Sequence, residues 1–92
     1  MRLDKKKERL AVENIGLVYF NLKKLEMLQN YLDYEDMVSI GMIGLIKVAI
    51  TFDESKKFAF SSYASKCIKN EILMLYRKEK SMRMIFLLMN QL

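Results

Sequence analysis

The residues with the clearest chemistry lie between Phe60 and Arg77, where cationic, amide and aromatic side chains recur at helical spacing. At about 100° per residue, one arc of this segment holds Ser62, Lys66, Lys69, Asn70, Leu73 and Arg77. Cations bind phosphates, amides hydrogen-bond to base edges, and the rings of Phe60 and Tyr63 offer faces for base stacking. These groups fit single-stranded or melted DNA. The plainer interpretation is a solvated cationic face, with Phe58, Phe60 and Tyr63 closing the core at the helix entrance.

Other kinds of site find little support in the sequence. The chain has no histidine and only one cysteine, Cys67, so neither an internal disulfide nor a Cys/His metal cluster can form. It contains no glycine-rich phosphate loop and no recognisable catalytic spacing of carboxylates, so we expect neither an enzyme nor a cofactor. A net charge of +5 favours polyanionic partners without choosing among DNA, RNA and acidic membrane.

These side chains need a helical frame, and the composition supplies it. The 92 residues include no proline and three glycines, and they suffice for one domain rich in helix. Helical periodicity covers about 10–28, 34–51 and 61–80. Gly16 either interrupts the first stretch or marks a close contact, Asp33 is the expected cap of the second, and Ser61 or Ser62 that of the third. We therefore expect an all-α fold, a small bundle of three to four helices.

The core-facing stripe of the third stretch is narrow: Ala64, Ile68, Ile72 and Leu75. The second stretch differs because it has two apolar stripes. A broad one suits a core and holds Met37, Val38, Gly41, Leu45, Val48, Ala49 and Phe52. The opposite side holds Ile40, Ile43, Ile46 and Ile50, interleaved with Asp36, Ser39 and Lys47. A helix that is apolar on both sides is central in a bundle or offers one side to a partner, and both alternatives remain open.

The ends of the chain predict neither a membrane span nor a secretion signal. The longest strongly apolar run, Met84–Met89, is far shorter than the roughly 20 residues that cross a bilayer. The basic start has no apolar signal core behind it, so we expect a cytoplasmic protein without a membrane partner. Residues 1–80 should form the helical domain and residues 81–92 an atypical apolar tail. This tail should pack back on the bundle, the simpler expectation for a small core, or form a dimer contact.

The order of several uncommon elements resembles the second conserved region of sigma-70 family factors. The resemblance lies in the segments 35–47 with its paired glycines, Phe52-Asp53, Phe60–Ala64 and Ile68. Residues 39–47 and 63–74 most resemble the mother-cell sporulation sigma factors of endospore-forming bacteria. The resemblance covers about Asn14 to Lys80, and it implies a helical domain of a bacterial transcription initiation factor.

The resemblance also implies two interfaces. The helix at 34–51 would dock on the clamp coiled coil of the largest subunit of core RNA polymerase, by position through Asp36, Ser39, Ile40, Met42 and Ile46. The next helix would melt or read the non-template strand of the promoter minus-ten element, by position through Phe60, Ser62, Tyr63, Lys66, Cys67, Lys69, Asn70 and Leu73. Arg77 extends the same face, and Tyr63 is the best candidate to stack on a flipped adenine. An anti-sigma factor is a further candidate partner.

The chain departs from the family pattern at several positions. Lys66 and Cys67 replace a tryptophan pair that wedges the duplex open in housekeeping members. Strand opening should therefore be weaker or depend more on charge, with Lys66 and Lys69 holding phosphates. Ile40 replaces an acid common in the docking helix, which shifts that contact towards apolar burial. Gly16 stands where many members have arginine.

The end of the chain is the largest departure. Functional members continue into a linker and a helix-turn-helix domain that reads the minus-thirty-five element, and nothing after Lys80 resembles either. We expect a short or split gene product, a frame-disrupted remnant or an excised piece. Two functions follow: an initiation module that binds polymerase and minus-ten DNA, or a truncated sigma fragment that occupies the polymerase as a decoy or regulator without initiating.

Overall fold

The computed structural model describes residues 4–53, 55 and 59–91. The elements in chain order are α1 (Lys5–Glu13), α2 (Gly16–Lys24), the short 3-10 helix η1 (Glu26–Asn30), α3 (Tyr34–Thr51) and α4 (Phe60–Asn90). The predicted all-α bundle is confirmed, with four α-helices and no strand in the part of the chain that the structure describes.

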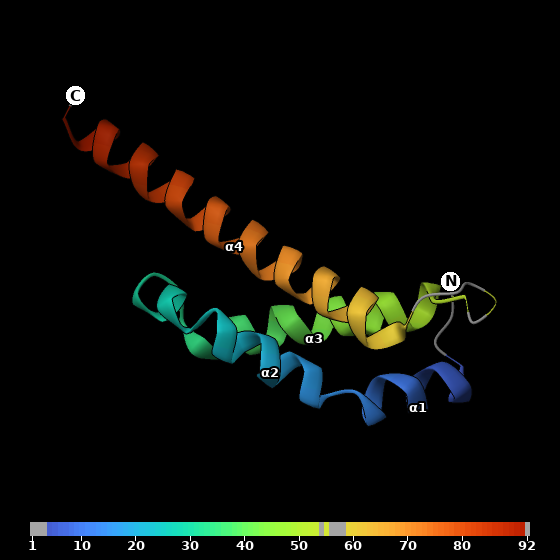
Figure 1. Cartoon of the computed structure of the whole chain (residues 1–92). Helices are drawn as coiled ribbons and strands as arrows, with labels where there is room; N and C mark the ends of the chain where they lie inside the picture. The colour runs from blue at the N-terminus through green and yellow to red at the C-terminus, as the bar shows by residue number, and fades with distance from the viewer. Residues whose placement is uncertain (1–3, 54, 56–58, 92) are drawn as a thin grey trace.

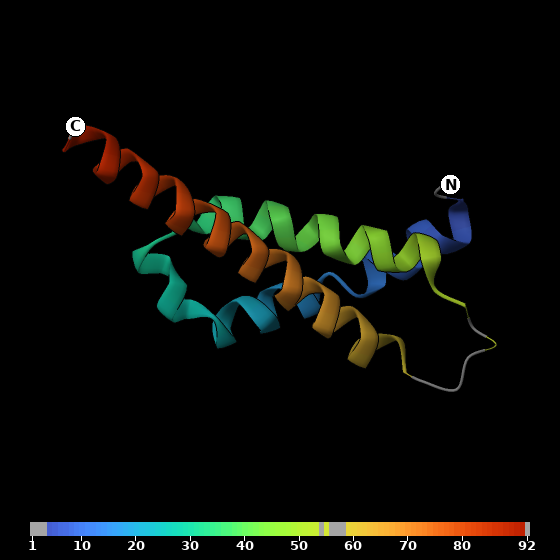
Figure 2. The ribbon, with the colours of Figure 1, turned by 90° about the horizontal axis from the view of Figure 1, so that it is seen from above.

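The central feature of the fold is the pair formed by α3 and α4, which cross each other (Figures 1 and 2). α1 packs against α3, and α2 packs against both members of the pair. The molecule is elongated, 55 × 27 × 22 Å, because the C-terminal part of α4 projects beyond the other helices (Figure 1). A helix of 31 residues is about 46 Å long, so α4 accounts for most of the long axis.

The first predicted stretch, 10–28, covers the end of α1, the whole of α2 and the start of η1, and the break between the two α-helices lies at Asn14 and Ile15. The Asn14 side chain donates to the Leu10 carbonyl at 2.7 Å and so satisfies a carbonyl near the end of α1. Gly16 begins α2, and a Cβ built there would meet nothing within 4 Å. A close contact is therefore not the reason for this glycine.

α3 has the predicted bounds and the predicted cap. The Asp33 carboxylate accepts from the Glu35 backbone nitrogen at 3.0 Å, which satisfies a free donor of the first turn. Most of the expected core face is buried: Met37, Leu45, Val48 and Ala49 are each at most 2% exposed. Gly41 is buried too, whereas Val38 and Phe52 are half-buried. The first four side chains join Val18 and Leu22 of α2 and Ile68 and Ile72 of α4 in one hydrophobic core.

The start of α4 differs from the prediction. Neither Ser61 nor Ser62 is the cap residue, because the helix begins at Phe60 behind Ala59 and has no side-chain cap. The Phe60 ring packs edge-on against Phe52, with ring centroids 5.0 Å apart, and this contact joins the first turn to the end of α3. Phe58, which we considered for the same role, lies outside the described residues.

The end of α4 also differs from the prediction. The expectation that the tail packs back on the bundle is wrong, because one unbroken helix continues to Asn90 and residues 81–90 are exposed. The segment has no proline or glycine to turn it. The edge-on contact of Tyr31 with Tyr76, at 5.6 Å between ring centroids, lies where α4 leaves the bundle. Within the described residues no helix, α4 included, is long and apolar enough to cross a bilayer.

Candidate functional site

The predicted arc forms one side of α4, and we call it the α4 face: Ser62, Lys66, Lys69, Asn70, Leu73 and Arg77. Lys69 and Leu73 are half-buried, whereas the other four are exposed. The opposite side of the helix is fixed by Ala64, Ile68 and Ile72, all fully buried in the core. Burial of one stripe therefore forces the cations and the amide outwards, which the periodicity predicts.

Tyr63 and Cys67 lie beside the α4 face, at the border with α3. Both line a groove of about 440 Å³ between the two helices. Tyr63 is 41% exposed, so closing the core does not account for its ring. Phe60 does fit the plainer interpretation, since it is half-buried against Phe52. An aromatic ring at the rim of a groove can accept a flat apolar group from solvent.

The groove has a charged pair that the sequence did not reveal. Lys47 Nζ lies 3.0 Å from Glu71 Oε1 across the α3–α4 contact. The helices meet closely here because Gly44 has no side chain: a Cβ would lie 3.2 Å from Glu71 Cγ and 3.3 Å from Ile68 Cα. This close approach of α3 and α4 brings Lys47 and Glu71 together. The spacing of four between Cys67 and Glu71 places both on one side of α4, but it does not by itself predict the pair or the groove.

α2 adds an aromatic and a cation that sequence reasoning missed. Lys24 Nζ lies 4.5 Å from the centre of the Phe20 ring, which is 56% exposed. α2 is joined to α4 through Asn21, whose Nδ2 donates to Ser65 Oγ at 3.1 Å and to the Leu17 carbonyl at 2.7 Å. The spacing of four between Phe20 and Lys24 could have suggested their contact, whereas the link from Asn21 to Ser65 has no local signal.

The second apolar stripe of α3 is partly covered. Ile43 and Ile46 are 45% and 40% exposed, and Asp36 and Ser39 beside them are exposed, so burial under the first helices is wrong for this part of α3. Ile40, Met42 and Ile50 are half-buried, and for these positions burial is correct in part. Half-buried Met42 and exposed Ile46 line a small hollow of about 160 Å³ together with residues of α1. We call Asp36, Ser39, Ile40, Met42, Ile43 and Ile46 the α3 stripe.

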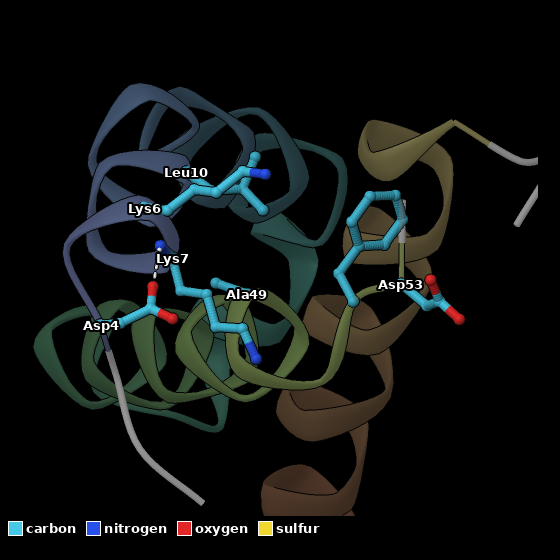
Figure 3. Close-up of a pocket in the computed structure, with 7 residues that line it drawn as sticks. Asp4, Lys6, Lys7, Leu10, Ala49 and Asp53 are labelled. Atoms are coloured by element: carbon cyan, nitrogen blue, oxygen red, sulfur yellow. Dashed lines mark hydrogen bonds between the residues drawn. The ribbon is translucent and has the colours of Figure 1, made fainter. Parts of the chain in front are cut away.

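α1 is attached at the far end of α3. Lys7 Nζ donates to the carbonyl of Ile50 in the last turn of α3, where a cation is favourable. Asp4 caps α1 by accepting from the Lys7 backbone nitrogen at 2.9 Å (Figure 3). The residues drawn in Figure 3, Asp53 among them, line a surface hollow of about 300 Å³. It is separate from the α4 face.

Hydrogen bonds hold the pKa of the Asp53 carboxyl below its usual value. The causes are donation from the Ser55 hydroxyl, at 2.7 Å, and then from the Ser55 backbone nitrogen, at 2.9 Å. Because the pKa is lowered in the folded state, this turn is stabilised above the unfolded-state pKa. The stabilisation is lost as pH falls through the folded-state pKa.

Comparison with known proteins identifies this arrangement. Residues 10–82 match the family described as Sigma-70 region 2, which is most of the chain. The chain belongs to the sigma-70 family. The predicted membership is thus confirmed. The sigma-70 region 2 match contains every residue of the α4 face and of the α3 stripe, and it ends at Met82, where α4 has left the bundle.

Similar proteins include sporulation sigma factors, in agreement with the predicted likeness. The chain is 40% identical over 74 residues to RNA polymerase sigma-E factor of Clostridium acetobutylicum and 42% over 72 to RNA polymerase sigma-28 factor of Bacillus thuringiensis subsp. kurstaki. It is 41% identical over 64 residues to RNA polymerase sigma-K factor of Bacillus subtilis. These alignments cover 80, 77 and 70% of this chain but 31, 30 and 21% of those relatives. The chain therefore spans less than a third of the length of each relative.

Proposed function

We propose that this chain acts in transcription initiation as a sigma region 2 module that binds core RNA polymerase through the α3 stripe and the minus-ten element through the α4 face. The observation that carries the proposal is that one bundle exposes two chemically different surfaces on two helices, both within residues 10–82 of the family match. The α4 face is cationic and has the Tyr63 ring beside it, and the α3 stripe is apolar with a polar edge.

Beside the α4 face, Tyr63 supplies the stacking surface for a base that leaves the duplex. The groove beside it gives the base a place with fewer water contacts, and the ring replaces the neighbour that the base loses. Lys66 and Lys69 hold the phosphates of the same strand. Because Cys67 is half-buried and small, it cannot wedge the duplex, and strand capture depends on charge and on this single ring.

At the α3 stripe, Ile43 and Ile46 provide the apolar centre of a docking surface, and Asp36 and Ser39 provide its polar edge. Exposed apolar side chains in helical register are suited to the side of another helix. The clamp coiled coil of the largest polymerase subunit is such a partner. Ile40 is half-buried here, so it contributes packing in place of charge.

The first experiment tests DNA capture. The chain bound to core polymerase is titrated with a fluorescent single strand that carries a minus-ten sequence, and Tyr63→Ala with Lys66→Ala is compared with wild type. Loss of one stacked base corresponds to about 1–3 kcal/mol, so we expect the interaction to be weaker by about fivefold or more. Tyr19→Ala is the matched control: Tyr19 is 48% exposed and points away from the side of α2 that carries Asn21. Wild-type affinity of the double variant for the strand would refute this assignment.

The second experiment tests docking. Ile43→Glu with Ile46→Glu places charge in the apolar centre of the α3 stripe and should abolish co-purification with core polymerase, while circular dichroism stays unchanged. Met27→Glu in η1 is the control, because Met27 is 64% exposed and lies outside the stripe. Retention of polymerase by the stripe variant at wild-type yield would exclude this surface.

A polymerase-binding decoy is the second candidate function. It is favoured by α4 beyond Met82, where the family match ends and apolar side chains occupy the exposed helix. Transcription in vitro from a matched promoter separates the two. A specific transcript with core polymerase supports the initiation module, whereas no transcript together with inhibition of another sigma factor supports the decoy.

A further inference from the structure

Asn21 is a polar residue in the apolar core. Its side chain is fully buried, and among the residues that the structure describes it is the one polar side chain with this burial. It follows the helical spacing of the core side of α2, which also carries the buried residues Val18 and Leu22. An apolar side chain here would add to the core without the cost of removing an amide from water. Core packing alone therefore does not account for Asn21.

The hydrogen bonds of Asn21 satisfy only one end of its amide. Nδ2 donates to the Leu17 carbonyl of its own helix at 2.7 Å and to Ser65 Oγ of α4 at 3.1 Å. Oδ1 is buried and accepts no hydrogen bond within the part of the chain that the structure describes. A buried acceptor without a partner destabilises a fold. Asn21 thus weakens the core, and its contact with Ser65 needs another explanation.

The hydrogen bond to Ser65 joins α2 to the first turns of α4. Burial and the second hydrogen bond, to Leu17, hold the amide of Asn21 in one orientation. Apolar contacts have no preferred direction, whereas a hydrogen bond weakens steeply when its angle changes. The Lys47–Glu71 ion pair also links α4 to α3, but the Lys47 side chain is 63% exposed, so this pair restrains α4 little. The rotation of α4 about its own axis therefore depends strongly on the buried hydrogen bond.

We propose that Asn21 is a positioning residue, which sets the rotation of α4 through Ser65. Buried asparagines can fix the register between packed helices at a cost in stability. Ser65 directly precedes Lys66 of the α4 face and Cys67 at the border with α3, so a rotation of α4 displaces both. At about 6 Å from the helix axis, a rotation of about 20° moves a side chain by about 2 Å. The setting of α4 is a property of the fold, and its effect on DNA rests on the function proposed above.

Cys67 reports the setting of α4 without DNA. It is the only cysteine of the chain, and it lies half-buried in the groove between α3 and α4. Asn21→Leu with Ser65→Ala replaces the polar pair with apolar side chains, so the free energy of unfolding in urea should stay the same or rise. Alkylation of Cys67 by iodoacetamide in the native state should become about threefold faster, because α4 can then rotate away from the setting that shields the thiol.

The matched control is Asn14→Leu with Ser61→Ala. Asn14 makes the same kind of hydrogen bond to the carbonyl four residues before it, at 2.7 Å, and Ser61 is an exposed serine in the first turn of α4. This control should keep the alkylation rate of wild type. Wild-type alkylation of the Asn21→Leu, Ser65→Ala variant, or an equal increase in the control, would overturn the proposal. Faster alkylation together with a lower free energy of unfolding would also overturn it, because the core would then open as a whole.

DNA selectivity tests the consequence for the α4 face. The full chain is titrated with a minus-ten single strand and with a scrambled strand of the same composition. The ratio of the two affinities should fall about threefold in the Asn21→Leu, Ser65→Ala variant and stay unchanged in Ser65→Thr, which keeps the hydroxyl. If Tyr63→Ala with Lys66→Ala lowers the ratio but the Asn21→Leu, Ser65→Ala variant does not, Asn21 does not position the DNA surface. If neither variant lowers it, the DNA assignment itself fails, and the alkylation rates alone decide whether Asn21 sets α4.

Discussion

At the scale of single residues, two glycines set the distances between helices. A Cβ on Gly41 would lie 2.8 Å from Val18 Cγ1, and one on Gly44 would crowd the backbone of α4. Val18 is fully buried and its branched side chain is short, so it cannot move aside. The paired glycines that help identify the family therefore have a packing role in this fold, independent of any contact with DNA or polymerase.

This packing role gives a direct prediction. Gly41→Val should lower the free energy of unfolding by about 1–3 kcal/mol, because the added methyl groups overpack the contact between α2 and α3. Urea denaturation monitored by circular dichroism measures the change. Gly16→Val is the matched control, since a Cβ there meets nothing within 4 Å and the expected change is below about 1 kcal/mol. Equal losses in both variants would show that the helix contact at Gly41 is not the cause.

Residue types predicted the exposed arc of α4 well, because helical periodicity is local. The Lys47–Glu71 pair was not predictable in the same way. Its two residues are 24 positions apart, and they meet only because Gly44 lets α3 approach α4. The contact of Phe20 with Lys24 is local, whereas the hydrogen bond from Asn21 to Ser65 joins residues 44 positions apart. Contacts between helices depend on packing that no single stretch encodes.

At the scale of elements, α4 has an apolar stripe that is buried in the bundle at one end of the helix and exposed to solvent at the other. Ile72 is fully buried between the helices, whereas Phe86, two heptads further along the same stripe, is 63% exposed. Burial provides the stabilisation of a helical bundle, and an exposed side chain provides little. The first part of α4 therefore stabilises the fold, and the last part contributes little to its stability.

Truncation of these two residues should separate the roles. Ile72→Ala should lower the free energy of unfolding by about 2–5 kcal/mol through lost burial and a cavity. Phe86→Ala should change it by less than about 0.5 kcal/mol in dilute solution. Urea denaturation of both variants at one low protein concentration is the measurement. A loss above about 1 kcal/mol for Phe86→Ala would mean that the tail packs on the bundle after all.

The bounds of an element were predictable where a residue next to the helix marks its start or end. Asp33 fixes the start of α3, and the bounds of that helix agree with the prediction. The predicted serine cap of α4 was wrong: the helix begins at Phe60 behind Ala59 without a side-chain cap, and the Phe60 ring contacts Phe52 of the preceding segment. The fate of the tail was wrong because apolar composition indicates burial without saying what is close enough to bury it.

At the scale of the whole molecule, the fold presents its candidate surfaces on separate helices that share one hydrophobic core. The sequence alone left the α3 stripe open between burial and partner binding, since amphipathic periodicity does not tell how far α1 reaches. The structure leaves Ile43 and Ile46 exposed and partly covers Ile40, Met42 and Ile50. The roles of the α3 stripe and the α4 face remain predictions. The cations of the α4 face offer a way to test whether this face binds DNA.

The net charge of +5 could attract DNA without any specific surface, and salt dependence distinguishes the two cases. Each phosphate contact on a single strand adds about 0.7 to the slope of log affinity against log salt, so Lys66→Gln with Lys69→Gln should reduce that slope by about 1.4. Lys5→Gln with Arg9→Gln removes the same charge from α1, which packs against α3, and should leave the slope unchanged. Titrations of the chain with a minus-ten single strand at several salt concentrations give both slopes. Equal reductions would mean that the whole charge of the molecule, and not the α4 face, attracts the strand.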